Sequence, residues 1–393
     1  MIEKGWSMIP RRIESKMLDM AAKFPIVSLT GPRQSGKSTL LKESFAEYRY
    51  VSLEDPDVRA FAYDDPRSFL KLYDNHVVID EAQNAPDLFS YLQSAVDKTG
   101  DPGQYILSGS QNFLMMQHIS QSLAGRVAVF KLLPFSYREL AEAGRSPSEI
   151  EDWMWTGGYP RIYDRDINPN DYFPHYVQTY LDRDVRQLGS VRNLTAFNAF
   201  VRLCAANIGG IMNITSLANT CDIDVKTARE WLSILETSYL VFRLPPYHKN
   251  FGKRLAKRPK LYFYDTGLAC NLLGIQAPER LRQHEKRGAL YENAVIAELM
   301  KRILAQGRSP ELYYWRDANQ KEVDLLIDEN GMLSQAWEIK SSATYKPSQF
   351  STLESVASLA NLPPEHRSVV YAGNDSFETK HGTVMTLADI DKD

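Results

Sequence analysis

Residues able to bind a triphosphate lie near the start of this sequence, where Gly31 to Ser38 read GPRQSGKS and fit the pattern G-x-x-x-x-G-K-[ST]. Glycines at both ends let the backbone turn sharply and point successive N–H groups at phosphate oxygens. Lys37 supplies a compact positive charge for the γ-phosphate, and the Ser38 hydroxyl can ligate Mg²⁺. We expect the nucleotide to contact Gly31, Pro32, Arg33, Gln34, Ser35, Gly36, Lys37, Ser38 and Thr39.

The sequence around this loop supports a phosphate site. An apolar run at residues 26–29 predicts a strand before the loop, and residues 37–45 predict a helix whose N-terminus favours anions. A second apolar run ends in the carboxylates Asp80 and Glu81. Asp80 would hold Mg²⁺ through water, and Glu81 would orient or deprotonate the attacking water. The two motifs together predict ATP hydrolysis with Mg²⁺ as cofactor.

Two further polar residues are candidates for the same reaction. Ser110 follows a predicted strand and could place its hydroxyl near the γ-phosphate. Arg126 precedes another strand and could act as an arginine finger, either within its own chain or toward a second copy in a homo-oligomer. The alternative for each is an ordinary polar side chain on a loop or surface. The sequence does not decide between these readings.

Composition indicates a soluble globular protein. The chain has 393 residues, of which 44 % are hydrophobic and 24 % charged, which fits about two or three domains. The net charge of −3 means that any nucleic-acid surface must be a local patch. The three cysteines are far apart, which argues against a zinc site and a disulfide framework. With no apolar run of about 18 residues and no apolar leader, we expect a cytoplasmic protein without a membrane partner.

The pattern along the chain predicts an α/β fold class. Short apolar strands alternate with helices at the start, which indicates a parallel sheet with ligands at the carboxyl ends of its strands. The strands are expected at residues 26–29, 50–52, 77–80, 104–108 and 127–132. We expect four parts, namely a P-loop ATPase domain at 1–145, a helical lid at 146–210, a winged helix-turn-helix with a basic loop at 211–262 and a further α/β domain at 263–393.

A nucleic-acid surface is expected in the third part. Residues 214–219 predict a short helix, and Asp224 is a good N-cap for a second helix whose outer face carries Lys226 and Arg229. A basic, aromatic-flecked segment at 247–260 follows and suits contact with a DNA backbone. The alternatives are a protein-binding or lid module, and a basic loop that docks on an acidic face of the same protein. The DNA-contacting candidates are Lys226, Arg229, Lys253, Arg254, Lys257 and Arg258, with Lys249 and Lys260 in the same basic run.

Paired carboxylates mark the C-terminal part. Two strands, 321–328 and 333–340, flank the turn signal Asn330-Gly331. Pairing them can bring Asp324, Glu338 and Lys340 together, where the carboxylates would bind a second divalent metal and Lys340 would stabilise charge or position water. Glu292 lies on the apolar stripe of a predicted helix at 289–304 and is a further candidate ligand. The alternative is a set of ordinary ion pairs.

Further motifs resemble those of a known family. They are VVIDEAQ, ILSGSQ, LAGR, KLLPFSYREL, GGYP, YLDRDV, LPPYHKNFGKRLAKRPKLYFYDTGLA, LYENAVIAEL, YYWRDANQKEVDLLI and EIKSS. With GPRQSGKS, they resemble the prokaryotic AAA-type P-loop ATPases that carry a C-terminal domain of unknown function with a PD-(D/E)xK nuclease-like fold. The resemblance implies that Asp324, Glu338 and Lys340 form a nuclease core, with Glu292 on a helix and Gln349 on the next one.

Two functions follow as expectations. In the first, ATP hydrolysis moves a DNA-bound winged helix and gates a metal-dependent nuclease. In the second, the protein is a non-cleaving ATP-dependent switch that regulates DNA or protein binding, and its C-terminal domain is a scaffold. The sequence leaves the choice between them open.

Overall fold

A parallel sheet forms the centre of the N-terminal region, as predicted. The computed structural model describes residues 8–110, 115, 119, 121–180, 191, 193–247, 258–360 and 362–390. The strands of this sheet lie in the order β2-β3-β4-β1-β5, and every neighbouring pair runs parallel. Their bounds are β1 Ile26–Thr30, β2 Arg49–Ser52, β3 Val77–Asp80, β4 Tyr105–Gly109 and β5 Val127–Lys131. The α/β class is therefore confirmed, and the predicted strands are found with small shifts at their ends.

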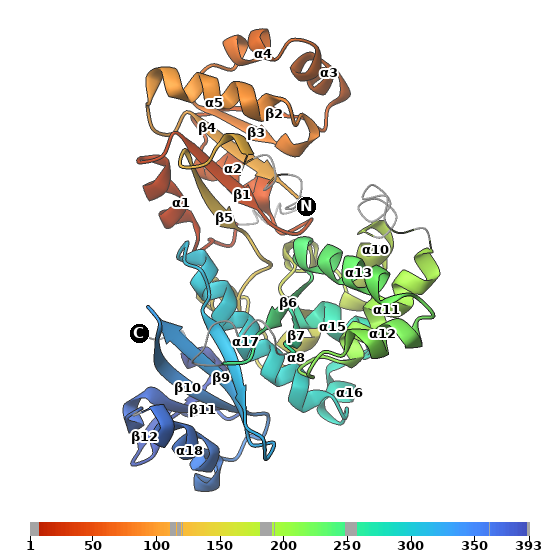
Figure 1. The fold of residues 1–393 in the computed structure, drawn as a ribbon, viewed down its shortest axis with the longest axis vertical. Coiled ribbons are helices and arrows are strands. Elements are labelled where there is room, and N and C mark those ends of the chain that lie inside the picture. The colour runs from red at the N-terminus through yellow and green to blue at the C-terminus, as the bar shows by residue number, and fades with distance from the viewer. Residues whose placement is uncertain are drawn as a thin grey trace, which may run out of the picture.

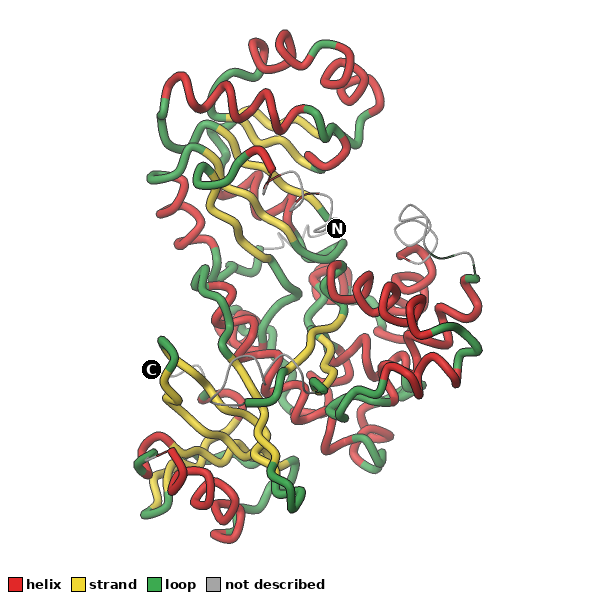
Figure 2. Tube along the Cα trace, in the orientation of Figure 1, coloured by secondary structure: helices red, strands yellow, loops and turns green. Residues whose placement is uncertain are grey.

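Helices cover both faces of this sheet, because successive residues of a strand point to opposite sides. Val27 and Leu29 belong to a core cluster with α1 and α2, whereas Ile26, Ile79 and Leu107 belong to a second cluster with α3, α4 and α5. Figures 1 and 2 show the resulting layers at the top of the molecule. The helices are α1 Glu14–Ala21, α2 Lys37–Ser44, α3 Pro56–Asp64, α4 Pro66–Leu72, the 3₁₀ turn η1 Ala82–Asn84, α5 Leu88–Thr99 and α7 Tyr137–Glu142.

Helices dominate the middle of the chain. They are α8 Ile150–Thr156, α9 Pro160–Arg165, α10 Pro169–Tyr180, α11 Leu194–Ala206, α12 Ile214–Thr220, α13 Val225–Thr237, α15 Thr266–Leu272 and α16 Pro278–Arg282. Strands β6 (Val241–Leu244) and β7 (Lys260–Phe263) pair antiparallel beside them. Asp224 caps α13 as predicted, since its Oδ1 accepts a hydrogen bond from the N–H of Thr227 at 2.9 Å. No helix in the described ranges is long and apolar enough to cross a membrane.

The GGYP and YDTGLA motifs lock together within this middle region. The Asp265 carboxylate accepts hydrogen bonds from the N–H of Gly158 at 2.7 Å and of Leu268 at 2.9 Å. A Cβ on Gly158 would lie 2.2 Å from the carbonyl oxygen of Phe135, so a side chain there would force the two backbones apart. These motifs therefore have a structural role, since they dock the middle region on the segment that leaves the parallel sheet.

A second, mixed sheet forms the C-terminal domain. Its order is β12-β13-β11-β10-β9-β8, with β8, β9 and β10 antiparallel and β11 parallel to β10. The predicted turn is confirmed, because Asn330 and Gly331 have φ of 57° and 82° and join β9 to β10. The elements are α17 Arg287–Ala305, β8 Leu312–Arg316, β9 Glu322–Glu329, β10 Met332–Lys340, η3 Pro347–Phe350, α18 Ser351–Ala360, η4 Pro364–His366, β11 Arg367–Tyr371, β12 Phe377–Thr379, β13 Gly382–Thr386 and η5 Leu387–Asp389.

Helix α17 links the three parts of the molecule and runs between them in Figure 1. Its buried residues belong to a core that also contains Leu133 from the segment after β5, side chains of the middle helices, and Val370 of β11. Lys301 donates from its Nζ to the carbonyl oxygen of Phe135 at 3.0 Å, and Glu298 accepts from the N–H of Tyr137 at 2.6 Å. The position of the C-terminal domain is thus tied to the chain that leaves the parallel sheet.

Candidate functional site

The predicted phosphate loop joins β1 to α2 at the carboxyl edge of the parallel sheet. Gly31 has a φ of 153°, which favours glycine. A Cβ at this position would lie 2.1 Å from the carbonyl oxygen of Leu132, which follows β5. Glycine is required at the start of the loop both by its backbone conformation and by the neighbouring main chain.

Two side chains inside the loop are suited to receive phosphate. Lys37 is 6 % exposed, and its Nζ donates to the carbonyl oxygens of Gly31 at 3.0 Å and Pro32 at 2.9 Å. Ser35 Oγ is buried and has no hydrogen-bond partner within the described part of the chain. A phosphate would supply an acceptor for this hydroxyl, and its charge makes it a stronger acceptor for Lys37 than neutral carbonyls are. The loop therefore fits a triphosphate.

Asp80 lies beside the loop at the end of β3 and is 5 % exposed. Its Oδ2 accepts hydrogen bonds from Ser38 Oγ at 2.7 Å and from the hydroxyl of Tyr50, and its Oδ1 accepts from Ser108 Oγ. Burial raises the pKa of Asp80, but the hydrogen bonds from Ser108, Tyr50 and Ser38 outweigh it and lower the pKa below its usual value. The carboxylate is therefore kept ionised.

The Asp80 carboxylate and the Ser38 hydroxyl fit Mg²⁺ as oxygen ligands. This ion prefers a few carboxylate or hydroxyl ligands together with waters and nucleotide phosphates. Ser38 begins the first turn of α2 and faces Asp80, so the two side chains can approach one ion from either side. Sequence reasoning missed Tyr50 and Ser108, which hold Asp80. The carboxyl ends of adjacent parallel strands meet at one edge of a sheet. Polar residues near the ends of β2 and β4 could therefore have indicated partners for Asp80.

Glu81 follows directly and has a left-handed backbone with φ of 53°. Its Oε2 accepts from Ser110 Oγ at 3.1 Å, from the N–H of Ser110 at 3.4 Å and from the Gln83 amide. Ser110 is thus found against the proposed catalytic carboxylate. The sequence did not indicate Gln83, which lies in η1.

Arg126 lies at the end of the strands opposite the phosphate loop, so its side chain is not placed beside the loop of its own chain. It directly precedes β5, and β5 runs parallel to β1, whose far end carries the loop. Its guanidinium forms a two-point ion pair with Asp97 at 2.6 and 2.9 Å. An action on a second copy of the chain stays a prediction.

Residues outside the loop hold it in place. The Arg11 guanidinium is buried and donates to the carbonyl oxygens of Ser35 at 2.9 Å and Leu133 at 2.6 Å, and to Glu139 at 3.1 Å. Two tyrosines of the middle region also reach it. The Tyr172 hydroxyl donates to Gln34 Oε1 at 2.8 Å, and the Tyr239 hydroxyl lies 2.6 Å from Thr30 Oγ1. The loop is therefore in direct contact with α10, and the last residue of β1, directly before the loop, contacts Tyr239 just after α13.

A recess opens beside the loop. Thr39 and Leu40 of α2 form one side, and Ile9, Phe135 and Tyr163 contribute apolar surface. An apolar wall next to a phosphate site is suited to a nucleotide base.

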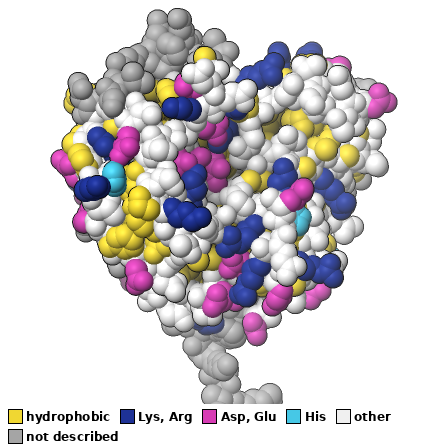
Figure 3. All heavy atoms as spheres, turned by 90° about the horizontal axis from the view of Figure 1, so that it is seen from below, with side chains coloured by type: hydrophobic (Ala, Val, Ile, Leu, Met, Phe, Trp, Pro, Cys, Tyr) yellow, Lys and Arg dark blue, Asp and Glu magenta, His cyan; other side chains and the backbone are white. Residues whose placement is uncertain are grey.

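The structure describes only some of the candidate DNA-binding residues. Lys226 and Arg229 are exposed on α13, and Arg258 is exposed just before β7. Lys253, Arg254, Lys257 and Lys249 lie outside the described residues, as does Arg183 of the YLDRDV motif. The face drawn in Figure 3 mixes Lys and Arg side chains with Asp and Glu, so it presents no extended patch of one charge.

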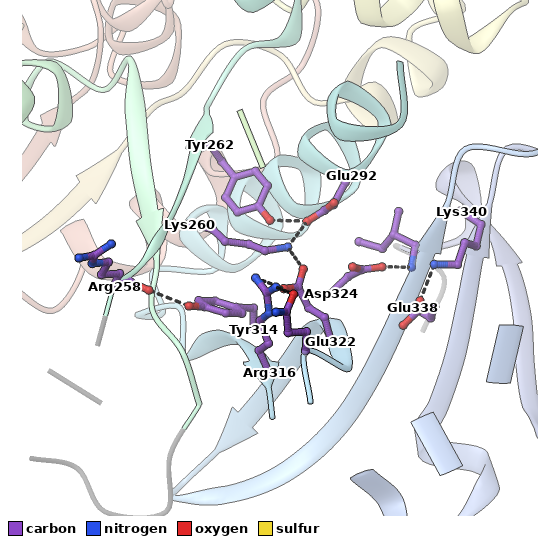
Figure 4. Close-up of polar contacts among 12 residues, drawn as sticks. Arg258, Lys260, Tyr262, Glu292, Tyr314, Arg316, Glu322, Asp324, Glu338 and Lys340 are labelled. Carbon is purple, nitrogen blue, oxygen red and sulfur yellow. Dashed lines mark hydrogen bonds and ion pairs between the residues drawn. The ribbon is translucent and has the colours of Figure 1, made fainter. Parts of the chain in front are cut away.

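The C-terminal acids converge where α17, β9 and β10 meet, as Figure 4 shows. Asp324 is buried, and its Oδ2 accepts from the N–H of Ile339 at 2.7 Å. Glu338 forms an ion pair with Lys340 two residues further along β10. Burial, together with the nearby charges of Glu292 and Glu338, raises the pKa of Asp324 well above its usual value. Gln349 lies in η3 rather than on a full helix and accepts from the N–H of Lys346 at 3.0 Å.

Lys260, which the sequence places in the basic run expected to contact DNA, is buried against carboxylates of the same chain. For this residue the structure fits the alternative of docking on an acidic face of the protein. Lys260 is 3 % exposed, and its Nζ lies 2.9 Å from Glu292 and 2.6 Å from Glu322. Tyr262 also donates to the Glu292 carboxylate. Among the described residues, no three His, Cys, Asp or Glu side chains are arranged to hold a metal ion. The predicted ligand set of Glu292, Asp324 and Glu338 therefore does not fit a metal in this arrangement.

Comparison with known proteins divides the chain into three segments. The AAA domain family matches residues 23–141, a domain of unknown function designated DUF8612 matches 147–279, and another, DUF4143, matches 287–390. The chain is 33 % identical over 389 residues to uncharacterized proteins of Mycobacterium tuberculosis and Mycobacterium bovis, covering 97 % of this chain and 84 % of theirs.

More distant similarities extend to other organisms. An uncharacterized protein of Haemophilus influenzae is 22 % identical over 312 residues, which cover 70 % of this chain and 74 % of that protein. A solved Walker-type ATPase of Pyrococcus abyssi is 15 % identical with a TM-score of 0.46, covering 67 % of this chain and 96 % of that one. The mycobacterial identity and the domain matches together show that this chain is an AAA-type P-loop ATPase with a C-terminal DUF4143 domain, and that it belongs to the same family as the mycobacterial proteins.

Proposed function

We propose that this protein is an ATP-driven switch, in which ATP hydrolysis at the loop of residues 31–38 controls how the middle region contacts DNA. Lys37 binds the γ-phosphate, Ser38 ligates Mg²⁺ and Asp80 holds that ion through water. Glu81 orients the attacking water, and Ser110 positions Glu81. The observation that carries the ATPase part is the grouping of Lys37, the Ser38–Asp80 hydrogen bond and Glu81 at one edge of the sheet.

Direct contacts between the loop and the middle region support the switch. A nucleotide must draw Lys37 away from the carbonyls of Gly31 and Pro32, which changes the loop between Thr30 and Gln34. Those two flanking residues are the ones bonded to Tyr239 and Tyr172. A change in the loop therefore acts first on the end of α13 and on α10.

The DNA part of the proposal rests on α12 and α13 with the β6–β7 pair, which we interpret as a winged helix-turn-helix. Lys226 and Arg229 face solvent on α13, and Arg258 faces solvent beside β7. These three side chains would contact phosphates. Because each such contact releases counterions, affinity for duplex DNA should fall steeply with salt. Duplex binding that is unaffected by salt, or that survives K226A/R229A/R258A unchanged, would remove this part.

The ATPase assignment has a direct test in two variants. Lys37→Ala should abolish both nucleotide binding and hydrolysis, because the loop loses the charge that neutralises the γ-phosphate. Glu81→Gln should retain ATP binding, measured by calorimetry, while turnover falls to background. Turnover at the wild-type rate in either variant would contradict the residue roles.

A metal-dependent nuclease in the C-terminal domain is the second candidate function. The observation that favours it is that Glu292, Asp324 and Glu338 gather at one place although they lie on three different elements. Incubation of plasmid and oligonucleotide DNA with Mg²⁺ or Mn²⁺ separates the two functions, with Asp324→Ala as the control. Cleavage that this variant loses supports a nuclease, whereas intact DNA under all conditions supports the non-cleaving switch.

A further inference from the structure

Lys260 connects two parts of the molecule that the domain matches separate. It starts β7, which pairs with β6 through the register Leu244↔Lys260. From there its side chain extends to Glu292 of α17 and Glu322 of β9, both in the C-terminal domain (Figure 4). Its ammonium also lies 5.5 Å from the centre of the Tyr314 ring. The cation of one region is thus buried among the anions of the next.

The charges around this position explain why a lysine is stable there. Glu292 and Glu322 touch the ammonium, and Asp324 and Glu338 lie close by. Burial alone lowers the pKa of Lys260, but the carboxylates of Glu292, Asp324 and Glu322 outweigh it and raise the pKa. Arg316 lies 3.7 Å from Glu322, and Lys340 pairs with Glu338. The negative charge of the cluster is therefore balanced by the side chains of Lys260, Arg316 and Lys340.

One carboxylate oxygen in the cluster is left without a partner. Glu338 is 7 % exposed, and its Oε2 is buried with no hydrogen bond from any described residue. Its other oxygen is occupied by Lys340. A buried anionic oxygen in this state is costly unless a cation or donor can reach it. The site thus retains capacity for a further positive group.

A divalent ion bound at this cluster would lie close to the Lys260 ammonium. The ammonium lies 2.9 Å from Glu292 Oε1, which also accepts a hydrogen bond from Tyr262, and 2.6 Å from Glu322. Mg²⁺ and Ca²⁺ bind oxygen ligands at about 2.0–2.6 Å, so an ion on the other Glu292 oxygen would still be near the ammonium. Two neighbouring cations repel each other strongly in a low dielectric, and the lysine therefore opposes binding of a divalent ion.

We propose that Lys260 is an internal counter-ion that closes the carboxylate cluster to divalent metal, because its charge takes the place that a metal ion would take. This inference deepens the second candidate function, because it assigns control of the C-terminal centre to the middle region. It explains why the expected ligands come together without forming a metal site. It does not depend on whether the cluster cleaves DNA.

The test is Mn²⁺ binding to the full chain without nucleotide, measured from the EPR signal of free Mn²⁺. K260M/E322Q removes one charge of each sign, which limits the repulsion left in the folded protein, and it retains Glu292, Asp324 and Glu338. E322Q is the matched control that keeps the lysine. We expect wild type and E322Q to bind no Mn²⁺ at the cluster, K260M/E322Q to gain an ion, and D324N added to it to remove that ion.

Two results would overturn the proposal. One is Mn²⁺ binding by the wild-type chain that D324N abolishes, because the lysine would then not exclude metal. This comparison of the wild-type chain with D324N needs no Lys260 variant, so it can overturn the proposal even if K260M/E322Q does not fold. The other is a folded K260M/E322Q chain, verified by circular dichroism, that gains no ion. Neither result touches the ATPase, whose failure would appear only in the nucleotide-binding and turnover assays.

Discussion

The two charged centres of this molecule hold their lysines in different ways. Lys37 donates to the main-chain carbonyls of its own loop, and the neighbouring Asp80 is held by hydroxyl groups. Lys260 is instead held by the carboxylates of Glu292 and Glu322 from two other elements. The first centre lies within the parallel-sheet domain, whereas the second joins the middle region to the C-terminal domain.

The difference separates a site that accepts a ligand from one that is closed. Neutral carbonyls and hydroxyls are modest partners, so a triphosphate with Mg²⁺ can replace them at small cost. The ion pairs of Lys260, at 2.6 and 2.9 Å, are more costly to replace, because removing one partner leaves an uncompensated buried charge. The phosphate loop can thus exchange its internal hydrogen bonds for a ligand at small cost, whereas the carboxylate cluster cannot.

The largest effect is expected from Asp80→Asn. The change removes the charge that holds Mg²⁺, and we expect the ATPase rate to fall by roughly 100-fold or more. Asp97→Asn is the matched control, because it makes the same substitution at the opposite edge of the sheet, where Asp97 pairs with Arg126. Steady-state turnover measures both. An equal loss in the control would show that the Arg126 edge takes part in the reaction.

Stability should distinguish the two lysines. Lys260→Met leaves Glu292 and Glu322 without their buried cation, for an expected loss of about 3–5 kcal/mol. Lys37→Met removes two hydrogen bonds to neutral carbonyls and a favourable charge interaction with Asp80, for a smaller expected loss of about 1–2 kcal/mol. Scanning calorimetry of the full chain compares them. Equal shifts of the unfolding transition would mean that the Lys260 ion pairs are not specially important to the fold.

Tyr50→Phe tests how the acid of the nucleotide centre is held. Losing the hydroxyl that donates to Asp80 should weaken Mg²⁺ about tenfold, since outer-shell partners of metal ligands have effects of this size. The readout is the Mg²⁺ concentration that half-saturates ATPase activity. Tyr63→Phe, on the exposed side of α3, is the control. An unchanged Mg²⁺ requirement would contradict the positioning role.

The smallest effect is expected from Tyr239→Phe, which removes the hydroxyl next to Thr30. One neutral hydrogen bond contributes about 1 kcal/mol, so hydrolysis should change only a few-fold. The informative measurement is hydrogen exchange of α12 and α13 with and without a non-hydrolysable ATP analogue. Nucleotide-dependent protection should shrink in the variant. Protection equal to wild type would mean that the loop does not signal through this contact.

The sequence predicted the fold best where an element depends only on residues that are adjacent in the sequence. The inner strands β1, β3 and β4 appear as mainly apolar runs because they are buried on both faces. The Asp224 cap and the Asn330-Gly331 turn are decided by a few adjacent residues. The position of Arg126 could not be predicted in this way, because the residues next to it in the sequence do not indicate its ion pair with Asp97.

Short segments of the sequence were sufficient to predict the phosphate loop, the acids at the end of β3 and the alternation of strands and helices, because each of these features depends on a few adjacent residues. Long-range packing placed Tyr50 and Ser108 against Asp80, Tyr239 against the end of β1, and Lys260 between Glu292 and Glu322. These pairs are separated by 28 to 209 residues. No local pattern records which distant charge or hydroxyl will satisfy a buried group, because that depends on how the elements pack.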